Sequence, residues 1–390
     1  MKRNVFSKIS AVLVVVLTLL FAFGCAQSSS TTSDPEPDPP QLKYGEIKNI
    51  VLIIGDGMGI EHVSAGQIYE GKQYGFSSWK YTSVNTDSVD TIGKSFITTD
   101  SAAGGTALAT GQLTVNGYVG KEWHGRDVET ILDRAKAKGK ATGVLTTDNL
   151  YGATPASFSA HALSRNDTED ILNSQLTSGV DLLCGSTASA CTDKADNIAE
   201  NGYTLCTDFE EIENAKTAEK AYWQFDMWGY NSDVKLEEVT PHALEYLSKD
   251  EDGFVIMIEQ AHIDKYSHDN DIEGMVKSVA SLNNTVEAVL EWVGDRKDTA
   301  ILITADHETG GLTVSTSSQS HSDIATLDNK KLYYDWESGG HTDSKVPLFV
   351  YGINPDYSWF GYYKSHHLIK NVNVYHIMAN LLNNGLRYAT

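Results

Sequence analysis

Acidic and imidazole side chains follow three short apolar runs in this chain of 390 residues. The runs are residues 49–54 (NIVLII), 254–258 (FVIMI) and 300–304 (AILIT). The side chains after them are Asp56, Glu259, Asp264, His268, Asp306 and His307. Carboxylates and imidazoles are common ligands of Zn²⁺ and similar ions, so a metal centre is one interpretation. Taken singly, an Asp between glycines is more often a turn residue, and Asp306-His307 also suits a helix cap.

The spacing within MIEQAHIDKYSHDND makes the metal interpretation more specific. Asp264 and His268 are four residues apart and share one face of a helical turn. With Glu259 they could converge on metal ions, whereas a solvated charged loop is the alternative for this segment. His341, in SGGHTDSKVPLFVYG, precedes another apolar run. Mixed nitrogen and oxygen ligation suits two adjacent Zn²⁺ sites built from Asp56, Asp264, His268, Asp306, His307 and His341.

The segment TTDSAAGGTALATG (98–111) has almost no large apolar side chain and one charge. It could be a flexible linker or a tightly packed helix of small residues. A third interpretation is that Asp100-Ser101 opens a helix that presents the Ser101 hydroxyl to an anion, because a helix N-terminus favours negative charge. On that interpretation, small residues keep bulk away from the bound anion.

The remaining pattern predicts the elements that position these side chains. Apolar runs without alternation predict strands covered on both faces, and amphipathic segments predict helices. The predicted strands are residues 49–54, 142–147, 180–184, 203–206, 254–258, 300–304 and 346–351. The predicted helices include residues 128–137, 236–247, 272–292 and 374–382. This alternation predicts an α/β fold, a three-layer α/β/α sandwich with a mostly parallel central sheet, in which ligands bind beyond the carboxyl ends of the strands.

Composition divides the chain into three expected segments. Residues 1–25 have a basic start and an apolar run ending in Gly24-Cys25, which is typical of a lipoprotein signal with a lipidated Cys25. A cleaved signal or an N-terminal membrane anchor is the alternative. Residues 26–43, rich in Ser, Thr, Pro and Asp, predict a tether, and residues 44–390 predict one folded domain. The protein is therefore expected to be exported, periplasmic or at the cell surface.

The charge and the cysteines restrict partners and cross-links. There are 52 acidic and 30 basic side chains, and the resulting net charge of −22 disfavours binding of nucleic acid by bulk charge. Membrane contact is expected only through the N-terminal lipid or anchor. A small anionic substrate is compatible, since bound metal ions outweigh a distant negative field. Cys184, Cys191 and Cys206 form no CxxC pair, so at most one disulfide and one buried thiol are expected.

Six motifs occur in the order found in alkaline phosphatases. They are GDGMG, TTDSAAGGTALATG, GATPASFSAHALSR, MIEQAHIDKYSHDND, TADHETGG and GGHTDSKVPLFVYG. The predicted domain resembles this family from about Ile50 to Tyr351. The resemblance implies an alkaline phosphatase-like fold, compact and without a large crown insertion, since the stretch from Glu308 to His341 is short. It also implies metal-dependent hydrolysis of small phosphate monoesters.

The resemblance assigns a role to each candidate ligand. Ser101 resembles the serine that attacks phosphorus and becomes phosphoserine. The zinc that activates this serine, and contacts its hydroxyl, would be held by Asp56, Asp306 and His307. A second zinc, at the leaving oxygen, would be held by Asp264, His268 and His341. Two zinc ions would then contact both apical oxygens of an in-line displacement.

Three further positions follow from the resemblance. Arg165 is similar to the phosphate-binding arginine of the family, although alone it would be interpreted as a helix-end residue. Lys265 resembles a lysine that reaches phosphate through water, although alone it would be a surface lysine. A third site, for one Mg²⁺, is implied at Asp56, Thr154 and Glu259. Gly152 departs from the family, whose members carry Asp or His there, and this leaves the identity of the third metal open.

Other functions stay open at this stage. A phosphodiesterase, sulfatase or phosphonate hydrolase of the same superfamily is one alternative, but a Cys/Ser-x-Pro-x-Arg sulfatase motif is absent from the sequence. A diester would need room where Arg165 and the third metal favour a monoester dianion. A lipoprotein that binds phosphate or metal without turnover is another alternative, although binding alone needs no nucleophile such as Ser101. The resemblance also makes a homodimer one option.

Overall fold

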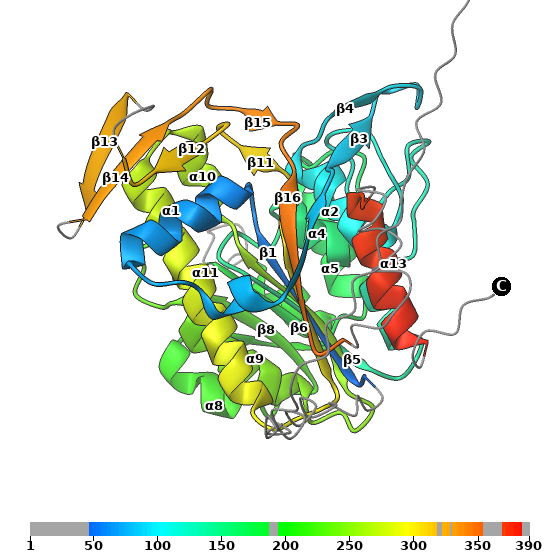
Figure 1. Cartoon of the computed structure of the whole chain (residues 1–390). Helices are drawn as coiled ribbons and strands as arrows, with labels where there is room; N and C mark the ends of the chain where they lie inside the picture. The colour runs from blue at the N-terminus through cyan, green and yellow to red at the C-terminus, as the bar shows by residue number, and fades with distance from the viewer. Residues whose placement is uncertain (1–46, 187–193, 318–321, 328–329, 354–368, 384–390) are drawn as a thin grey trace, which may run out of the picture. The chain divides into compact units, whose positions relative to one another are not determined.

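A nine-stranded sheet forms the centre of the computed structural model, which describes residues 47–186, 194–317, 322–327, 330–353 and 369–383 (Figure 1). The strand order is β2-β16-β10-β1-β9-β5-β6-β8-β7. In chain order the strands are β1 Asn49–Gly55, β2 Lys80–Val84, β5 Ala141–Thr146, β6 Leu182–Ser186, β7 Tyr203–Cys206, β8 Lys220–Phe225, β9 Phe254–Gln260, β10 Thr299–Thr304 and β16 Val346–Tyr351. Neighbours from β10 to β7 are parallel, and β16 pairs antiparallel with β10 and β2. The expected signal and tether, residues 1–43, lie outside the described residues.

Helices cover both faces of the sheet. They are α1 Ile60–Glu70, α2 Ser101–Thr110, α3 Ile131–Lys136, α4 Ala153–Ser159, α5 Thr168–Thr177, α7 Ala195–Glu200, α8 Ile212–Ala215, α9 Leu236–Leu247, α10 His262–His268, α11 Ile272–Val293 and α13 Asn371–Leu382. One layer contains α1, α9, α10 and α11, and the opposite layer contains α2, α3, α4, α5 and α13 (Figure 1). The predicted three-layer α/β sandwich with a mostly parallel sheet is therefore confirmed.

The differences from the predicted elements have local causes. Strands β2 and β8 were not expected, because β2 is a half-exposed edge strand and β8 (KAYWQF) mixes aromatic and polar residues. Helix α3 is shorter than residues 128–137, since Thr130 caps its N-terminus by accepting a hydrogen bond from the Asp133 N–H at 3.1 Å. Helix α13 begins at Asn371, earlier than position 374.

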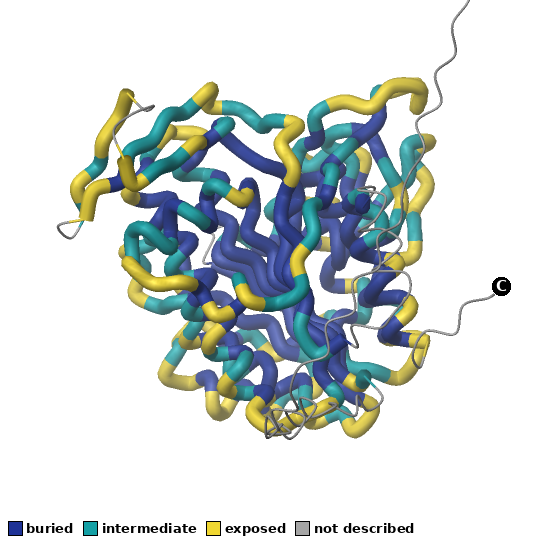
Figure 2. Tube along the Cα trace, viewed as in Figure 1, coloured by how far each residue is buried: buried dark blue, intermediate teal, exposed yellow. Residues whose placement is uncertain are grey.

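The central strands are buried along their whole length and end at one edge of the sheet (Figure 2). Strand β1 lies between β9 and β10, with Ile54 opposite both Glu259 and Thr304. Because these strands are parallel and in register, the residues that follow them emerge together at the carboxyl edge. This register brings Asp56, Glu259 and Asp306 to one place.

Helix α2 explains the run of small residues, since all ten of its residues are buried. A Cβ atom on Gly104 would lie 2.8 Å from the backbone oxygen of Asp306, and one on Gly105 would lie 3.1 Å from the Ser157 hydroxyl on α4. The small residues therefore let α2 pack closely against the end of β10 and against α4. The linker interpretation is wrong, and close helix packing, rather than room for an anion, accounts for both glycines.

Three small sheets lie outside the central one. Strands β11 (Glu308–Thr309) and β15 (His341–Thr342) pair antiparallel, and β12 (Thr313–Ser315), β14 (Lys330–Asp335) and β13 (Asp323–Leu327) form a three-stranded sheet. The sequence did not predict these strands in the short stretch before His341. The β11–β15 pair affects the site directly, because it brings His341 next to Thr309, shortly after the end of β10.

Cys184 and Cys206 are buried free thiols on β6 and β7. Both are in register with Trp223 on the intervening β8. One strand therefore separates them, about two inter-strand spacings of ~4.8 Å, which is too far for a disulfide. Cys191 lies outside the described residues.

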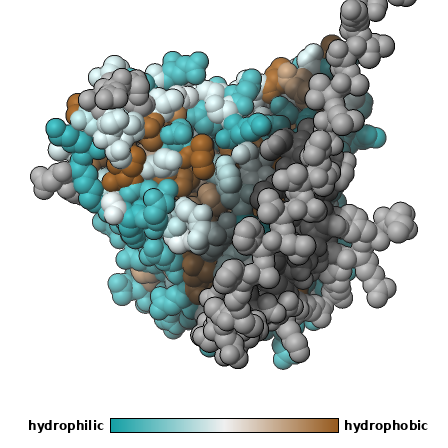
Figure 3. Space-filling model, in the orientation of Figure 1, coloured by the Kyte–Doolittle hydropathy of each residue, from teal (hydrophilic) through white to brown (hydrophobic). Residues whose placement is uncertain are grey.

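The surface visible in Figure 3 is mainly hydrophilic, in line with the high net charge. An exception is the hairpin of β3 (Asp87–Val89) and β4 (Phe96–Thr98), where Ile92, Phe96 and Ile97 are exposed. Within the described ranges, every helix is too short or too polar to cross a membrane.

Candidate metal centre

Asp56, Asp306 and His307 meet at the carboxyl edge of the sheet, directly after β1 and β10. The Nε2 atom of His307 lies 3.5 Å from Oδ1 of Asp56 and 3.4 Å from Oδ2 of Asp306. One ligand atom from each residue lies within 4.8 Å of the others, and all three side chains are buried. One cation could contact all three.

Two buried oxygens of this group accept no hydrogen bond within the described part of the chain. Oδ1 of Asp306 accepts from the backbone N–H groups of Gly57 at 3.2 Å and His307 at 3.1 Å, whereas Oδ2 of Asp306 and Oδ1 of Asp56 accept none. A buried carboxylate oxygen without a donor is unfavourable. A bound cation would remove this penalty, so the donor set fits a metal ion.

A second group combines Asp264 and His268 on α10 with His341 on β15. Nε2 of His268 lies 3.3 Å from Oδ2 of Asp264, and Nε2 of His341 lies 3.6 Å from Oδ1 of the same carboxylate. The rings of His341 and His307 stack with centroids 3.6 Å apart, so the two groups are contiguous. Ligand atoms of Asp264, His307 and His341 also lie within 4.8 Å of one another, so His307 borders both groups, and the division into two sets of three ligands stays a prediction.

The outer hydrogen bonds of the histidines fix their tautomers. Nδ1 of His268 lies 2.7 Å from the Gly339 carbonyl oxygen, and Nδ1 of His341 lies 2.8 Å from that of Thr99. Carbonyl oxygens only accept, so both Nδ1 atoms carry a proton, and each ring in its neutral form presents the lone pair of its Nε2 atom to the centre. The two Nε2 atoms lie 3.2 Å apart. A proton on one of them, or a cation bound by both, would stabilise this arrangement. A backbone carbonyl behind each ring is the usual arrangement of a metal-binding histidine.

Negative charge is crowded in this centre. Burial, followed by Asp306 and Asp264, raises the pKa of Asp56, and burial followed by Asp264 raises the pKa of Asp306 to about 7. Burial lowers the pKa of His307, which keeps that ring neutral. The hydrogen bond to Asp264 raises the pKa of His268 to about 9. Divalent cations would replace the protons that these groups otherwise hold.

Ser101 is the first residue of α2, next to this centre. Its Oγ lies 3.1 Å from Nε2 of His307, and the residue is buried. Asp100 caps the helix, because its Oδ1 accepts from the N–H of Ala103 at 2.9 Å. The cap and the positive end of the helix dipole place the Ser101 hydroxyl where a negative group is stabilised.

Arg165 reaches the same helix end. Its Nη1 donates to Oδ2 of Asp100 at 3.2 Å, and its backbone N–H donates to the Gly117 carbonyl at 2.8 Å. The guanidinium group is partly exposed and keeps further N–H donors. It can therefore bind an anion beside Ser101.

The predicted third set combines Asp56 with Glu259, whose charge acts on Asp56, and with Thr154. Glu259 accepts a hydrogen bond from the Thr146 hydroxyl, and burial, followed by the Asp148 charge, raises its pKa to about 8. Thr154 lies near the N-terminus of α4 and is 1% exposed, and its hydroxyl has no partner among the described residues. The unpartnered Thr154 hydroxyl and the carboxyl groups of Glu259 and Asp56 are oxygen donors of the kind that Mg²⁺ prefers.

Lys265 is not a free surface lysine. Its Nζ lies 3.0 Å from Oδ2 of Asp148 and 5.0 Å from the ring centroid of Trp228. Asp56 and Glu259 also attract its charge. Lys265 is therefore a positively charged side chain that interacts with two carboxyl groups of the third donor set, those of Asp56 and Glu259.

Three supporting contacts were not predicted from the sequence, although Asp100 was expected to open its helix. The Thr309 hydroxyl donates to Oδ1 of Asp264 at 2.5 Å and lies 3.2 Å from Nδ1 of His307. Asp100 caps α2 and pairs with Arg165. The Thr146 hydroxyl donates a hydrogen bond to Glu259. A signal existed for two of them. Asp before a helix is a common cap, and Thr309, two residues after His307 in extended backbone, faces the same side.

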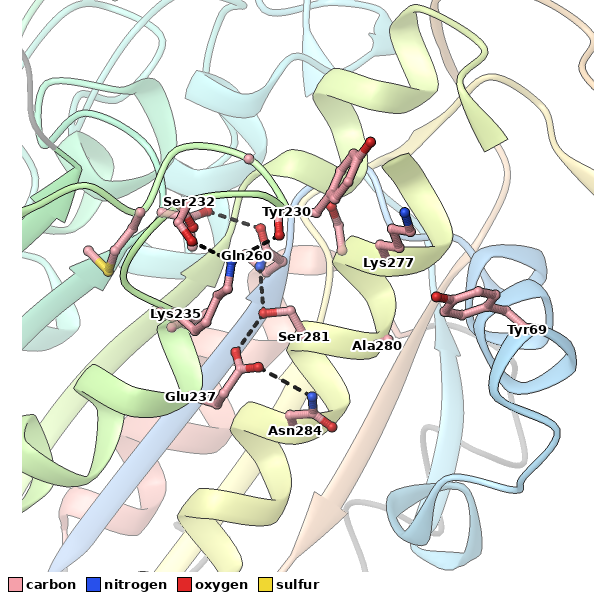
Figure 4. A pocket seen from close by; sticks show the side chains of 15 residues that line it. Tyr69, Tyr230, Ser232, Lys235, Glu237, Gln260, Lys277, Ala280, Ser281 and Asn284 are labelled. Atoms are coloured by element: carbon pink, nitrogen blue, oxygen red, sulfur yellow. Dashed lines mark hydrogen bonds between the residues drawn. The ribbon is translucent and has the colours of Figure 1, made fainter. Parts of the chain in front are cut away.

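A polar pocket of about 210 Å³ lies beside Gln260 at the end of β9, next to α9 and α11 (Figure 4). Gln260 accepts from Thr147 at 3.0 Å and donates to Ser281 at 3.2 Å, and Ser281 donates to Glu237 at 2.8 Å. The volume is below the usual range for a ligand pocket. Because these groups satisfy one another, the pocket is better understood as support for the end of β9.

Comparisons with known proteins all point to the same protein family. The family model described as alkaline phosphatase matches residues 47–199 and 219–333. Alkaline phosphatase 4 of Bacillus subtilis is 31% identical over 291 residues, which are 69% of this chain and 63% of the relative, so less than two thirds of its length is spanned. Alkaline phosphatase from the Antarctic bacterium TAB5 superimposes with a TM-score of 0.74 at 25% identity, covering 88% of this chain and 100% of that one. A variant of the TAB5 enzyme, 24% identical with a TM-score of 0.74 and the same coverage, was solved with Mg bound in its M3 site.

Proposed function

The chain belongs to the alkaline phosphatase family, and we propose that it hydrolyses phosphate monoesters through a phosphoserine on Ser101. The observation that carries the proposal is the position of the Ser101 hydroxyl. It lies at the N-terminus of α2 and 3.1 Å from Nε2 of His307, inside a cluster of carboxylates and imidazoles. Binding of phosphate alone would not need a hydroxyl in that place.

The reaction has two displacements. Oγ of Ser101 forms a bond to phosphorus while the bond to the leaving oxygen breaks; the serine proton is released, and the leaving alcohol takes up a proton. Water then attacks the phosphoserine, which releases inorganic phosphate and restores the Ser101 hydroxyl. The helix N-terminus stabilises negative charge on Ser101 and on the phosphoryl group in both displacements.

Arg165 and Lys265 are proposed to bind the phosphoryl group. The Arg165 guanidinium, oriented by Asp100, can donate two parallel hydrogen bonds to phosphoryl oxygens. Lys265, held by Asp148, supplies a positive charge that acts through water. Two cationic side chains favour a dianionic monoester over a monoanionic diester.

The proposed cofactors are two Zn²⁺ and one Mg²⁺ per subunit. Asp56, Asp306 and His307 would hold one zinc, with the Ser101 hydroxyl as a further ligand, and Asp264, His268 and His341 would hold the other. When bound, these ions lower the pKa of the serine hydroxyl and neutralise charge on the phosphoryl oxygens. The magnesium would be held by Asp56, Thr154 and Glu259.

The setting of the activity is part of the proposal. Residues 44–390 would be the catalytic domain, and residues 26–43 would tether it to a lipid on Cys25 after export. The substrates would then be small phosphate monoesters outside the cytoplasm. The high negative charge supports a role that does not involve nucleic acid.

A comparison of Ser101→Ala with the matched variant Ser248→Ala tests the proposal, since the Ser248 hydroxyl is exposed and bonded to the Glu245 carbonyl. Hydrolysis of p-nitrophenyl phosphate by the zinc-loaded protein should fall by a factor on the order of 10³ or more in Ser101→Ala only, with zinc content unchanged. Faster cleavage of bis-p-nitrophenyl phosphate by the wild type would favour a diesterase. Metal-loaded wild type without any hydrolysis at alkaline pH would refute a catalytic role.

A further inference from the structure

The space beside Gly152 is already filled by another side chain. A Cβ atom at position 152 would lie 2.7 Å from Oδ2 and 3.1 Å from Cγ of Asp148, and 2.9 Å from the Asn149 carbonyl oxygen. Gly152 has a φ of −54°, which any residue can adopt. Glycine is therefore required by the closeness of the Asp148 carboxylate and the Asn149 carbonyl oxygen, and not by its φ angle.

Asp148 is held firmly in this position at the carboxyl end of β5. Its Oδ1 accepts from the Asn149 N–H at 2.8 Å, and its Oδ2 accepts from Nζ of Lys265 at 3.0 Å. Its backbone N–H donates to the Thr146 hydroxyl at 2.9 Å, and that hydroxyl in turn donates to Glu259. One chain of hydrogen bonds thus joins Asp148 to the third donor set.

Without a cation, one ammonium group and bound protons must balance the carboxylates around this set. Asp56, Glu259 and Asp148 are three carboxylates that interact with one ammonium group, that of Lys265. The buried hydroxyl of Thr154 and Oδ1 of Asp56 have no hydrogen-bond partner in the described ranges. One divalent cation would balance the charge and give the Thr154 hydroxyl a partner.

Gly152 offers no side chain to the third metal site. We infer that Asp148, four residues upstream, supplies the acidic group of this site instead. Asp56, Thr154 and Glu259 are the direct ligands. Asp148 would be a positioning residue: it orients Lys265, and it would accept hydrogen bonds from water bound to the Mg²⁺. This inference rests on the proposed function, because the third site is part of that proposal.

Titration of the zinc-loaded full chain with MgCl₂ by calorimetry measures this role without using activity. Asp148→Asn keeps the shape of the side chain and removes its charge, so it should weaken Mg²⁺ binding about 10–100-fold while zinc content stays at two. Asp127→Asn is the matched control, since Asp127 also pairs with a lysine, Lys121, far from the site in sequence. It should bind Mg²⁺ like the wild type.

A positional exchange separates this role from a merely structural one. Gly152→Asp alone should weaken Mg²⁺ binding, because the new side chain collides with Asp148. In the double variant Asp148→Ala/Gly152→Asp the contacts with the Asp148 carboxylate are gone and only the Asn149 carbonyl oxygen stays close, at 2.9 Å, so Mg²⁺ affinity should exceed that of Asp148→Ala. Affinity of Asp148→Asn equal to that of the wild type, a double variant no better than Asp148→Ala, or no Mg²⁺ binding by the wild type would overturn the inference.

Failure of the inference can be distinguished from failure of the proposed function. A wild type that hydrolyses phosphate monoesters but binds Mg²⁺ independently of Asp148 contradicts only the role of Asp148. A wild type that binds Mg²⁺ through Asp148 but does not hydrolyse esters contradicts only the catalytic proposal.

Discussion

The hydroxyl of Thr309 donates a hydrogen bond to Oδ1 of Asp264 at 2.5 Å. The same oxygen atom of Thr309 lies 3.2 Å from Nδ1 of His307, which can donate to it. Thr309 therefore connects a ligand of one proposed zinc to a ligand of the other. It also fixes the His307 tautomer that leaves the Nε2 lone pair directed toward Ser101 and the carboxylates.

Replacement of this hydroxyl should weaken both zinc sites. Thr309→Val has nearly the same shape but neither donates nor accepts, so zinc affinity should fall about 10–100-fold and hydrolysis should fall with it. Thr309→Ser should recover most of the affinity. Zinc content after dialysis against a competing chelator measures this, and equal retention by Thr309→Val and wild type would contradict the linking role.

Arg165 should matter for substrate binding more than for the fold. Arg165→Ala removes a guanidinium group that pairs with Asp100, and Arg165→Lys keeps the charge but loses the bidentate geometry. Both variants should raise KM for p-nitrophenyl phosphate and weaken inhibition by inorganic phosphate, by about tenfold or more for the loss of a charge-assisted pair. The zinc content and the thermal midpoint serve as controls. Unchanged phosphate inhibition in Arg165→Ala would contradict a phosphate-binding role.

The close contact between α2 and β10 predicts a strong effect at Gly104. A Cβ atom there would lie 2.8 Å from the Asp306 backbone oxygen, so Gly104→Ala should lower the free energy of unfolding by about 1–3 kcal/mol despite the better helix propensity of alanine. Gly75→Ala is the control, because a Cβ atom at Gly75 has no neighbour within 4 Å. Urea unfolding of both metal-free variants measures the change in the free energy of unfolding. Equal stability would show that α2 can move away from Asp306.

Removal of metal should make stability depend on pH in a definite direction. Burial raises the pKa of Glu259 from 4.5 to about 8 and that of Asp306 from 3.8 to about 7. At a pH between the unfolded and the folded pKa of each group, the folded protein holds a proton that the unfolded chain has released. The free energy of unfolding of the metal-free protein then decreases as pH rises. The pKa of His268, raised by Asp264 from 6.5 to about 9, changes stability in the same direction.

Thermal unfolding with and without a chelator tests this dependence. The difference in midpoint between metal-loaded and metal-free protein should widen from about pH 6 to about pH 9, because bound cations replace the protons that the cluster otherwise needs. Metal-free protein that becomes more stable over this range would contradict the crowding of carboxylates described above.

Much of the site could be predicted because strand ends are local features of the sequence. The apolar runs before Asp56, Glu259 and Asp306 identified buried parallel strands, and parallel strands place their carboxyl ends at one edge. The spacing of Asp264 and His268 gave their shared helical face. The resemblance to a family then supplied roles that spacing alone left open.

The remaining features depend on contacts between distant segments. His341 joins the centre because β15 pairs with β11, and its ring is held by the carbonyl of Thr99, which lies 242 residues earlier. The separation of Cys184 and Cys206 depends on β8, a strand that the sequence did not predict. No local pattern encodes such pairings.

The α/β class, the strand ends that carry the candidate ligands and the serine at the start of a helix could be predicted from the sequence. Each of these follows from side-chain periodicity or from neighbours a few residues apart. Which atoms meet became clear from the folded chain: the Nε2 atoms that face one another, the unpartnered buried oxygens, and Asp148 in the space beside Gly152. Those relationships depend on how elements pack, and packing is set by the whole core at once.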